Sequence, residues 1–143
     1  MKYLCLICAE TVMEQMSEAD ASKHYEAYRE FTEDIRRRGH LIGCNRLVPP
    51  HAATTIRVRN GKISATDGPF AETKELIAGF WLLQVSSREE ALEWAKRIPT
   101  EAGKTTQVEV RRIMEAEDFG EAFTAEARAA EDRLRETIAE QHG

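Results

Sequence analysis

The sequence predicts an α+β fold in which two helices cover one face of an antiparallel sheet. Residues 2–9 and 76–85 are apolar runs of strand length, and residues 54–66 contain two strand-like segments around Asn60-Gly61. Two helical patterns each begin with Ser followed three residues later by an acidic residue. The order of these elements is that of the ferredoxin-like βαββαβ arrangement, followed by one extra C-terminal helix.

The first helix is predicted after residue 17, where Ser17 and Asp20 resemble a capping box. Gly39 is placed to end it in the left-handed conformation. Residues 41–50 end in a pair of prolines, and we expect them to be a connector rather than a central strand. Apolar residues recur at helical spacing at Ala21, Tyr25, Tyr28, Phe31 and Ile35.

The hairpin is the clearest local signal, because Asn-Gly is the preferred two-residue loop of a type I′ turn. This turn predicts that Val58 lies opposite Ile63 and that Arg57 lies opposite Ser64. The loop at residues 67–75 then leads to the apolar strand 76–85.

A second helix is predicted from the capping pair Ser87 and Glu90, with one apolar side and Pro99 as its stop. Residues 105–113 alternate as a half-buried strand, and residues 117–141 predict the third helix. The apolar side of the second helix comprises Ala91, Trp94, Ala95 and Ile98, and a narrow apolar seam on the third comprises Phe119, Phe123, Ala127, Ala130, Leu134 and Ile138. The seam fits packing on the domain or on a partner.

The 143 residues are enough for one domain, predicted at 1–115, with a helical extension at 116–143. A net charge of −5 argues against a nucleic-acid partner, and the N-terminal apolar run is too short for a signal sequence or a membrane span. Cys5 and Cys8 point to opposite faces of a strand, so we expect reduced thiols in a cytoplasmic protein.

Both long apolar strands are apolar on two faces, although the helices of this topology cover only one. The apolar seam of the third helix is too narrow, and the helix is too charged, to cover the other face of the sheet. A second copy packed sheet to sheet would cover it, which predicts a homodimer with a barrel-like centre. The space between the sheets would be apolar in the middle and polar at its edges, as small-molecule clefts are.

The chain resembles the YCII-related family over residues 1–115, in the branch named for its Asp-Gly-Pro-Phe motif. The most specific feature is the string Asp-Gly-Pro-Phe-Ala-Glu-Thr-Lys-Glu at residues 67–75, supported by the hairpin, by Gly79-Phe80 and by residues 91–95 and 108–111. The resemblance implies a dimeric α+β barrel, a bacterial cytoplasmic protein sometimes found beside extracytoplasmic-function sigma factors, and a suspected enzymatic activity. It also implies a His-Asp pair as the suspected active site, for which His24 matches by position.

Asp67 and His24 are the predicted catalytic residues, and Lys74, Glu72, Arg57 and Trp81 are the predicted ligand-binding residues. Asp67 could act as a general base, and a histidine such as His24 suits acid–base work because the ordinary pKa of this residue type lies near neutrality. Each has a structural alternative: Asp67 as a turn residue, His24 as a packed histidine, and Lys74 as one side of an interface salt bridge. His51 is a second histidine candidate in a loop.

No metal-ligand spacing, glycine-rich phosphate loop or Gly-x-Ser-x-Gly motif occurs in the sequence, so no cofactor is predicted. The expected function is proton transfer on a small organic molecule without a cofactor. The rival hypotheses are a non-catalytic binding or regulatory module, and a loop at 67–75 that only secures a dimer interface.

Overall fold

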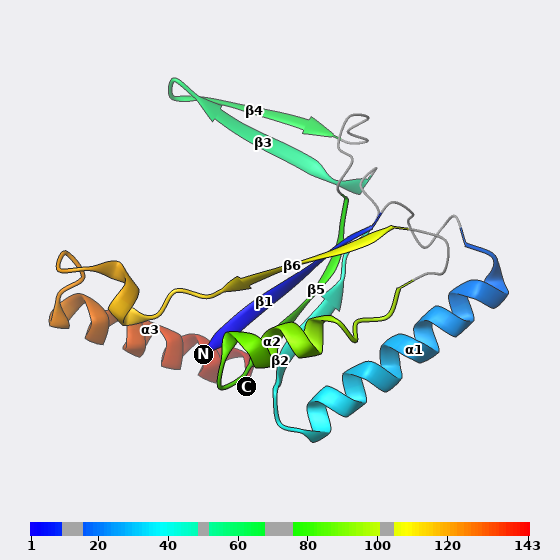
Figure 1. Cartoon of the computed structure of the whole chain (residues 1–143). Helices are drawn as coiled ribbons and strands as arrows, with labels where there is room; N and C mark the ends of the chain where they lie inside the picture. The colour runs from blue at the N-terminus through cyan, green and yellow to red at the C-terminus, as the bar shows by residue number, and fades with distance from the viewer. Residues whose placement is uncertain (10–15, 49–51, 68–75, 101–104) are drawn as a thin grey trace. The chain divides into compact units, whose positions relative to one another are not determined.

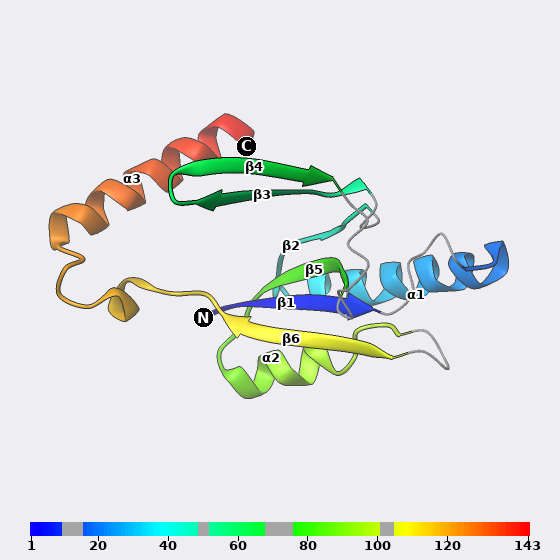
Figure 2. The same ribbon diagram turned by 90° about the horizontal axis from the view of Figure 1, so that it is seen from above.

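A computed structural model describes the chain except for residues 10–15, 49–51, 68–75 and 101–104. In the described part, the chain forms two compact units, Met1–Arg112 and Ile113–Gly143. The first contains a four-stranded antiparallel sheet in the order β2-β5-β1-β6, which can be followed in Figure 2. Its strands are β1 (Lys2–Ala9), β2 (Leu41–Arg46), β5 (Leu76–Gln84) and β6 (Thr106–Arg112).

Two helices pack on one face of this sheet (Figure 1), as the ferredoxin-like arrangement requires. In α1 (Glu18–Arg37), the Ser17 hydroxyl accepts a hydrogen bond from the Asp20 amide at 3.2 Å, which caps the first turn. In α2 (Arg88–Ala95), Ser87 caps the Glu90 amide in the same way at 3.1 Å. Both capping predictions are confirmed.

The core lies between the sheet and these helices. Tyr3 and Cys5 of β1 face it, and they lie opposite Leu83 and Trp81 of β5. Of the apolar positions expected on α1, Phe31 and Ile35 are buried, Tyr28 is half-buried against the core and Tyr25 is exposed. The apolar side expected for the second helix is buried throughout, at Ala91, Trp94 and Ala95 of α2 and at Ile98 after it. Burial raises the pKa of the Cys5 thiol to about 11, so this cysteine is an inert core residue.

The strand β2 corrects one prediction, because residues 41–50 were expected to be a connector. Leu41–Arg46 pairs instead with β5 and forms one edge of the sheet. Gly43 and Asn45 have low strand propensity, and the apolar pattern is broken, so the local sequence does not show the strand. Pairing with β5 stabilises it.

The close pairing of β2 and β5 depends on Gly79. A Cβ atom at this position would lie 2.7 Å from the Asn45 carbonyl oxygen and 3.3 Å from the Arg46 Cα atom. Only glycine lets the backbones approach this closely. The Gly79-Phe80 sequence therefore sets the position of Arg46 at the sheet edge.

The hairpin forms as predicted, with β3 (Thr54–Arg59) and β4 (Lys62–Asp67) joined at Asn60-Gly61. Both turn residues have positive φ, 52° and 76°, as a type I′ turn requires. Val58 lies opposite Ile63, and Arg57 lies opposite Ser64. Among the described residues, β3 and β4 form a two-stranded sheet that is separate from the four-stranded one.

The second unit is helical, but its helix begins later than predicted. A short 3-10 helix, Ala116–Phe119, precedes α3 (Ala125–His142). The Phe119 and Phe123 rings pack against each other at 4.8 Å before α3 starts. Leu134 and Ile138 are exposed on α3. None of the helices in the described part of the chain is both long and apolar enough to cross a membrane.

Candidate functional site

Asp67, the first predicted catalytic residue, is the last residue of β4 and is exposed. Its carboxylate oxygen Oδ1 accepts a hydrogen bond from the Thr54 hydroxyl at 2.7 Å. Thr54 is its cross-strand neighbour at the first residue of β3. This bond joins the two strands where the chain enters and leaves the hairpin, so Asp67 has a structural role that is compatible with an exposed carboxylate.

Two other predicted residues are placed by their secondary structure. Arg57 is exposed in the middle of β3. His24 is half-buried in the second turn of α1, four residues before Tyr28, which places the two side chains on one side of the helix. The catalytic role of each candidate stays a prediction. Glu72, Lys74 and His51 lie outside the described residues.

Trp81 is placed in the core rather than on the face that turns away from the helices. Its side chain is 2% exposed, its ring centroid is 4.5 Å from that of Tyr28, and its indole N–H lies 3.4 Å from the Thr32 hydroxyl. A ligand therefore finds no surface of Trp81 to contact. Phe80, its neighbour along β5, points to the opposite face.

Arg46 and two tyrosines of α1 form a group that the sequence analysis did not assemble. The Arg46 guanidinium carbon lies 3.8 Å from the ring centroid of Tyr28 and 4.9 Å from that of Tyr25. At these distances the cation lies against the faces of the rings, where their electrostatic potential is negative. We call Tyr25, Tyr28 and Arg46 the arginine–tyrosine site.

The Tyr28 phenol is held in its neutral form. Burial raises its pKa to about 12, and the nearby Cys44 side chain acts in the same direction, while the charge of Arg46 opposes both. A phenolate would neutralise the arginine, but Tyr28 carries no charge at neutral pH. The positive charge of Arg46 is therefore not offset by its tyrosine neighbour.

A second group, at the other end of β2, involves His40. Its Nδ1 atom lies 3.0 Å from the Gln84 carbonyl oxygen, and its Nε2 atom lies 3.0 Å from Glu90 Oε1. Both partner atoms accept hydrogen bonds, so both contacts are hydrogen bonds only when the ring carries a proton on each nitrogen. The other oxygen of Glu90 accepts from the Ser86 amide at 2.8 Å, which orients this carboxylate.

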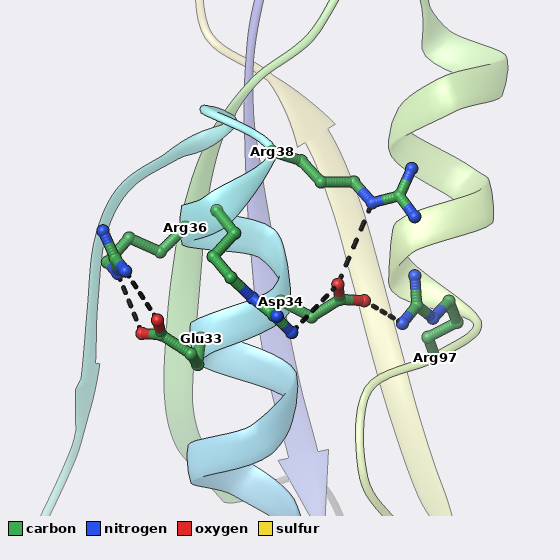
Figure 3. A network of polar contacts seen from close by, with 6 residues as sticks. Glu33, Asp34, Arg36, Arg38 and Arg97 are labelled. Carbon is green, nitrogen blue, oxygen red and sulfur yellow. Dashed lines mark hydrogen bonds and ion pairs between the residues drawn. The ribbon is translucent and has the colours of Figure 1, made fainter.

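Charged residues at the end of α1 form a third group, shown in Figure 3. Asp34 lies between Arg97, from the turn after α2, and Arg38, and a hydrogen bond from Arg97 is the largest cause of its lowered pKa. Glu33 pairs with Arg36 through two hydrogen bonds, one of them 2.8 Å long, which lower the pKa of its carboxyl. Each of these arginines is paired with a carboxylate of the same chain.

No group of three or more His, Cys, Asp or Glu side chains suited to a metal ion occurs among the residues that the structure describes. Cys5 is buried, and Cys8 and Cys44 are half-buried. Among the described residues, the candidates for catalysis or ligand binding are therefore Asp67, His24, the His40–Glu90 pair and the arginine–tyrosine site.

The fold is a ferredoxin-like α+β domain with a hairpin between its second and third sheet strands. The model of the YCII-related domain matches residues 1–122, and the chain belongs to this family. It is also 46% identical over 75 residues to an uncharacterised protein of Rhizobium meliloti (strain 1021). That match covers 52% of this chain and 60% of the relative.

Proposed function

We propose that the protein is a cytoplasmic homodimer of the Asp-Gly-Pro-Phe branch that transfers a proton on a small organic molecule bound between two sheets. The single observation that carries the proposal is the chemistry of the sheet face that turns away from α1 and α2. We call it the distal sheet face.

The centre of the distal sheet face is apolar. Leu4 lies opposite Leu82, and Leu6 lies opposite Phe80, and all four are half-buried. One row of polar side chains borders them, because Gln107, Glu109 and Arg111 of β6 point to the same side. An apolar centre with a polar border supports a sheet-to-sheet interface that leaves room for a small ligand at its edge.

Proton transfer is supported by the types of side chain available. Asp67 is an exposed carboxylate, and His24 is a half-buried imidazole. In the proposal these two residues move the proton, and Arg57, Glu72 and Lys74 orient the substrate. The reaction class is isomerisation or elimination at a carbon beside a carbonyl or carboxylate, which needs no redox step.

The dimer is tested by charge substitution on the distal sheet face. We expect Leu6→Glu to be monomeric in light scattering, because two carboxylates would be buried against apolar side chains across a two-fold interface. Leu134→Glu, on the exposed side of α3, is the matched control and should remain dimeric. A dimeric Leu6→Glu variant with an unchanged circular dichroism spectrum would contradict the interface.

The chemistry is tested without knowing the substrate. Small 2-oxo acids and unsaturated lactones are incubated with the protein in D₂O, and exchange of carbon-bound hydrogen is followed by NMR. We expect exchange on a member of the panel to fall by about a hundredfold or more in Asp67→Asn, since general acid–base catalysis contributes about that much. A dimeric Asp67→Asn variant with undiminished exchange would remove Asp67 from the mechanism.

A regulatory module is the second candidate function. It is favoured by Leu134, which is 59% exposed, and Ile138, which is 48% exposed, since together they give α3 an apolar side for a partner such as a transcription factor. If Leu134→Glu abolishes regulation in the cell while exchange chemistry is absent from wild type, this candidate replaces the enzyme. If Lys74→Ala weakens only the dimer, the loop at 67–75 serves the interface.

A further inference from the structure

We propose that the arginine–tyrosine site binds a small organic anion, whose carboxylate or phosphate group is held by the guanidinium of Arg46. The site lies on the helix-covered side of the sheet, because Arg46 is paired with Gly79 and contacts α1. It is thus distinct from the distal sheet face, and it does not depend on the proton-transfer chemistry proposed there.

The first step of the argument is the charge of Arg46. No carboxylate of a described residue lies within ion-pair distance of its guanidinium, whose described neighbours are the two tyrosine rings. In contrast, Arg36 is paired with Glu33, and Arg97 is paired with Asp34. Arg46 is exposed, and it carries a positive charge for which the described part of the chain supplies no anion.

The second step is the direction of its hydrogen-bond donors. A guanidinium is planar, and its N–H groups point outward in that plane. A cation whose carbon lies 3.8 Å from the Tyr28 centroid contacts the ring through its flat face, so the rings occupy the faces and leave the donor edge free for an acceptor. A carboxylate or phosphate matches two parallel N–H donors, which explains why arginine binds these groups so specifically.

The third step is rigidity. The backbone of Arg46 is fixed by its close approach to Gly79, and the Leu47 amide bonds to the Ala78 carbonyl at 2.9 Å. The buried ring of Trp81 packs against the ring of Tyr28 and holds it in place. A cation that is already positioned loses little conformational entropy when it binds an anion.

The fourth step is the surface around the charge. Tyr25, whose ring lies beside the Arg46 guanidinium, is 48% exposed, and Leu47, the next residue after Arg46, is also 48% exposed. Exposed apolar surface therefore lies close to the positive charge. This surface favours an anion with an apolar or planar body over a small hydrated ion. Benzoate is therefore a suitable probe, benzamide is its uncharged counterpart, and inorganic phosphate tests the other anionic group.

The experiment is an NMR titration of the full-length protein, with the arginine Nε–H resonances observed. We expect benzoate to shift the Arg46 resonance and benzamide to leave it unchanged. In Arg46→Gln, the dissociation constant for benzoate should rise by about tenfold or more, since a charge-assisted hydrogen-bonded pair is lost. Arg46→Lys should also bind more weakly, because lysine keeps the charge but not the two parallel donors.

Arg36→Gln is the matched control, since it removes the same charge from an arginine that is already paired with Glu33. It should bind benzoate as wild type does. Phosphate that binds in place of benzoate, and also requires Arg46, would assign the site to the phosphate group. The proposal is overturned if Arg46→Gln binds both anions like wild type, if benzamide binds like benzoate, or if neither anion shifts the Arg46 resonance up to about 50 mM.

Discussion

Two regions beside α1 use arginine in opposite ways. At the C-terminal end of the helix, Asp34 holds Arg38 and Arg97, so each positive charge meets a carboxylate of the same chain (Figure 3). Nearer the N-terminal end of α1, the guanidinium of Arg46 lies against the rings of Tyr25 and Tyr28. The comparison teaches that the partner of an arginine, rather than its exposure, indicates whether the residue serves the fold or a ligand.

The first region has a clear structural purpose. Arg97 follows α2, so its ion pair with Asp34 joins the two helices, and its guanidinium also lies 4.6 Å from the Trp94 ring centroid. Pairs of this kind at the surface contribute little free energy. The second region joins α1 to a sheet edge, and its cation–π contacts contribute about 0.5–2 kcal/mol without neutralising the charge.

The largest expected effect comes from Gly79→Ala, which disturbs the arginine–tyrosine site through the backbone. The added Cβ would lie 2.7 Å from the Asn45 carbonyl oxygen, so β2 must move away from β5. We expect a loss of about 1–3 kcal/mol in the free energy of unfolding, measured by chemical denaturation, together with weaker benzoate binding.

Gly43→Ala is the control for this substitution, because a Cβ at Gly43 meets no atom within 4 Å. It lies on β2, the strand that pairs with β5, and adds the same methyl group, so it should change stability by less than about 0.5 kcal/mol. If both variants lose the same stability, the close approach at Gly79 is not what positions Arg46.

A smaller effect is expected from Tyr28→Phe, which keeps the ring beneath Arg46 and removes the phenol. Removing this half-buried hydroxyl should cost about 1 kcal/mol, while benzoate binding should persist. Because the phenol pKa is raised in the folded protein, its stabilising contribution is complete below the ordinary tyrosine pKa and is lost as pH rises through about 12.

Ultraviolet titration of tyrosine ionisation tests this assignment. The wild-type protein should contain a group that ionises near pH 12 and that is absent from Tyr28→Phe. Tyr25→Phe, which changes the exposed tyrosine of the same site, should retain that group. If Tyr28→Phe abolishes benzoate binding while the fold is intact, the phenol rather than the ring is the essential part.

The local elements of the fold could be predicted from the sequence because their signals are local. Ser17 and Ser87 cap helices through hydrogen bonds within one turn, and Asn60-Gly61 determines the hairpin register through its own backbone angles. The strand β2 could not be predicted, because the stabilisation of Leu41–Arg46 comes from β5, more than thirty residues away in the chain.

The same difference in range explains what was missed among the candidate site residues. The sequence favoured residues in or beside the loop motif, whereas Arg46 attracts attention only once β2 is known to be a strand beside α1. Phe80 and Trp81 alternate along a strand that is apolar on both faces, so the sequence predicts that one of them faces the core without saying which, and the burial of Trp81 shows that it is Trp81. His40 and Glu90 likewise belong to separate elements.

The smallest effect is expected in the carboxylate region, from Asp34→Asn. The pKa of Asp34 is lowered first by the hydrogen bond from Arg97, so its contribution to stability is complete above the ordinary aspartate pKa and is lost as pH falls through the lower folded value. At neutral pH, thermal unfolding should show a small loss of stability that shrinks as salt is added. The difference between variant and wild type should begin to shrink as pH falls below 3.8, the ordinary aspartate value, and should disappear only below the lowered folded value. Benzoate binding should be unaffected throughout, because Asp34 does not touch the arginine–tyrosine site. A variant that loses benzoate binding along with this stability would show that the two arginine regions are coupled through α1, and the distinction between them would then fail.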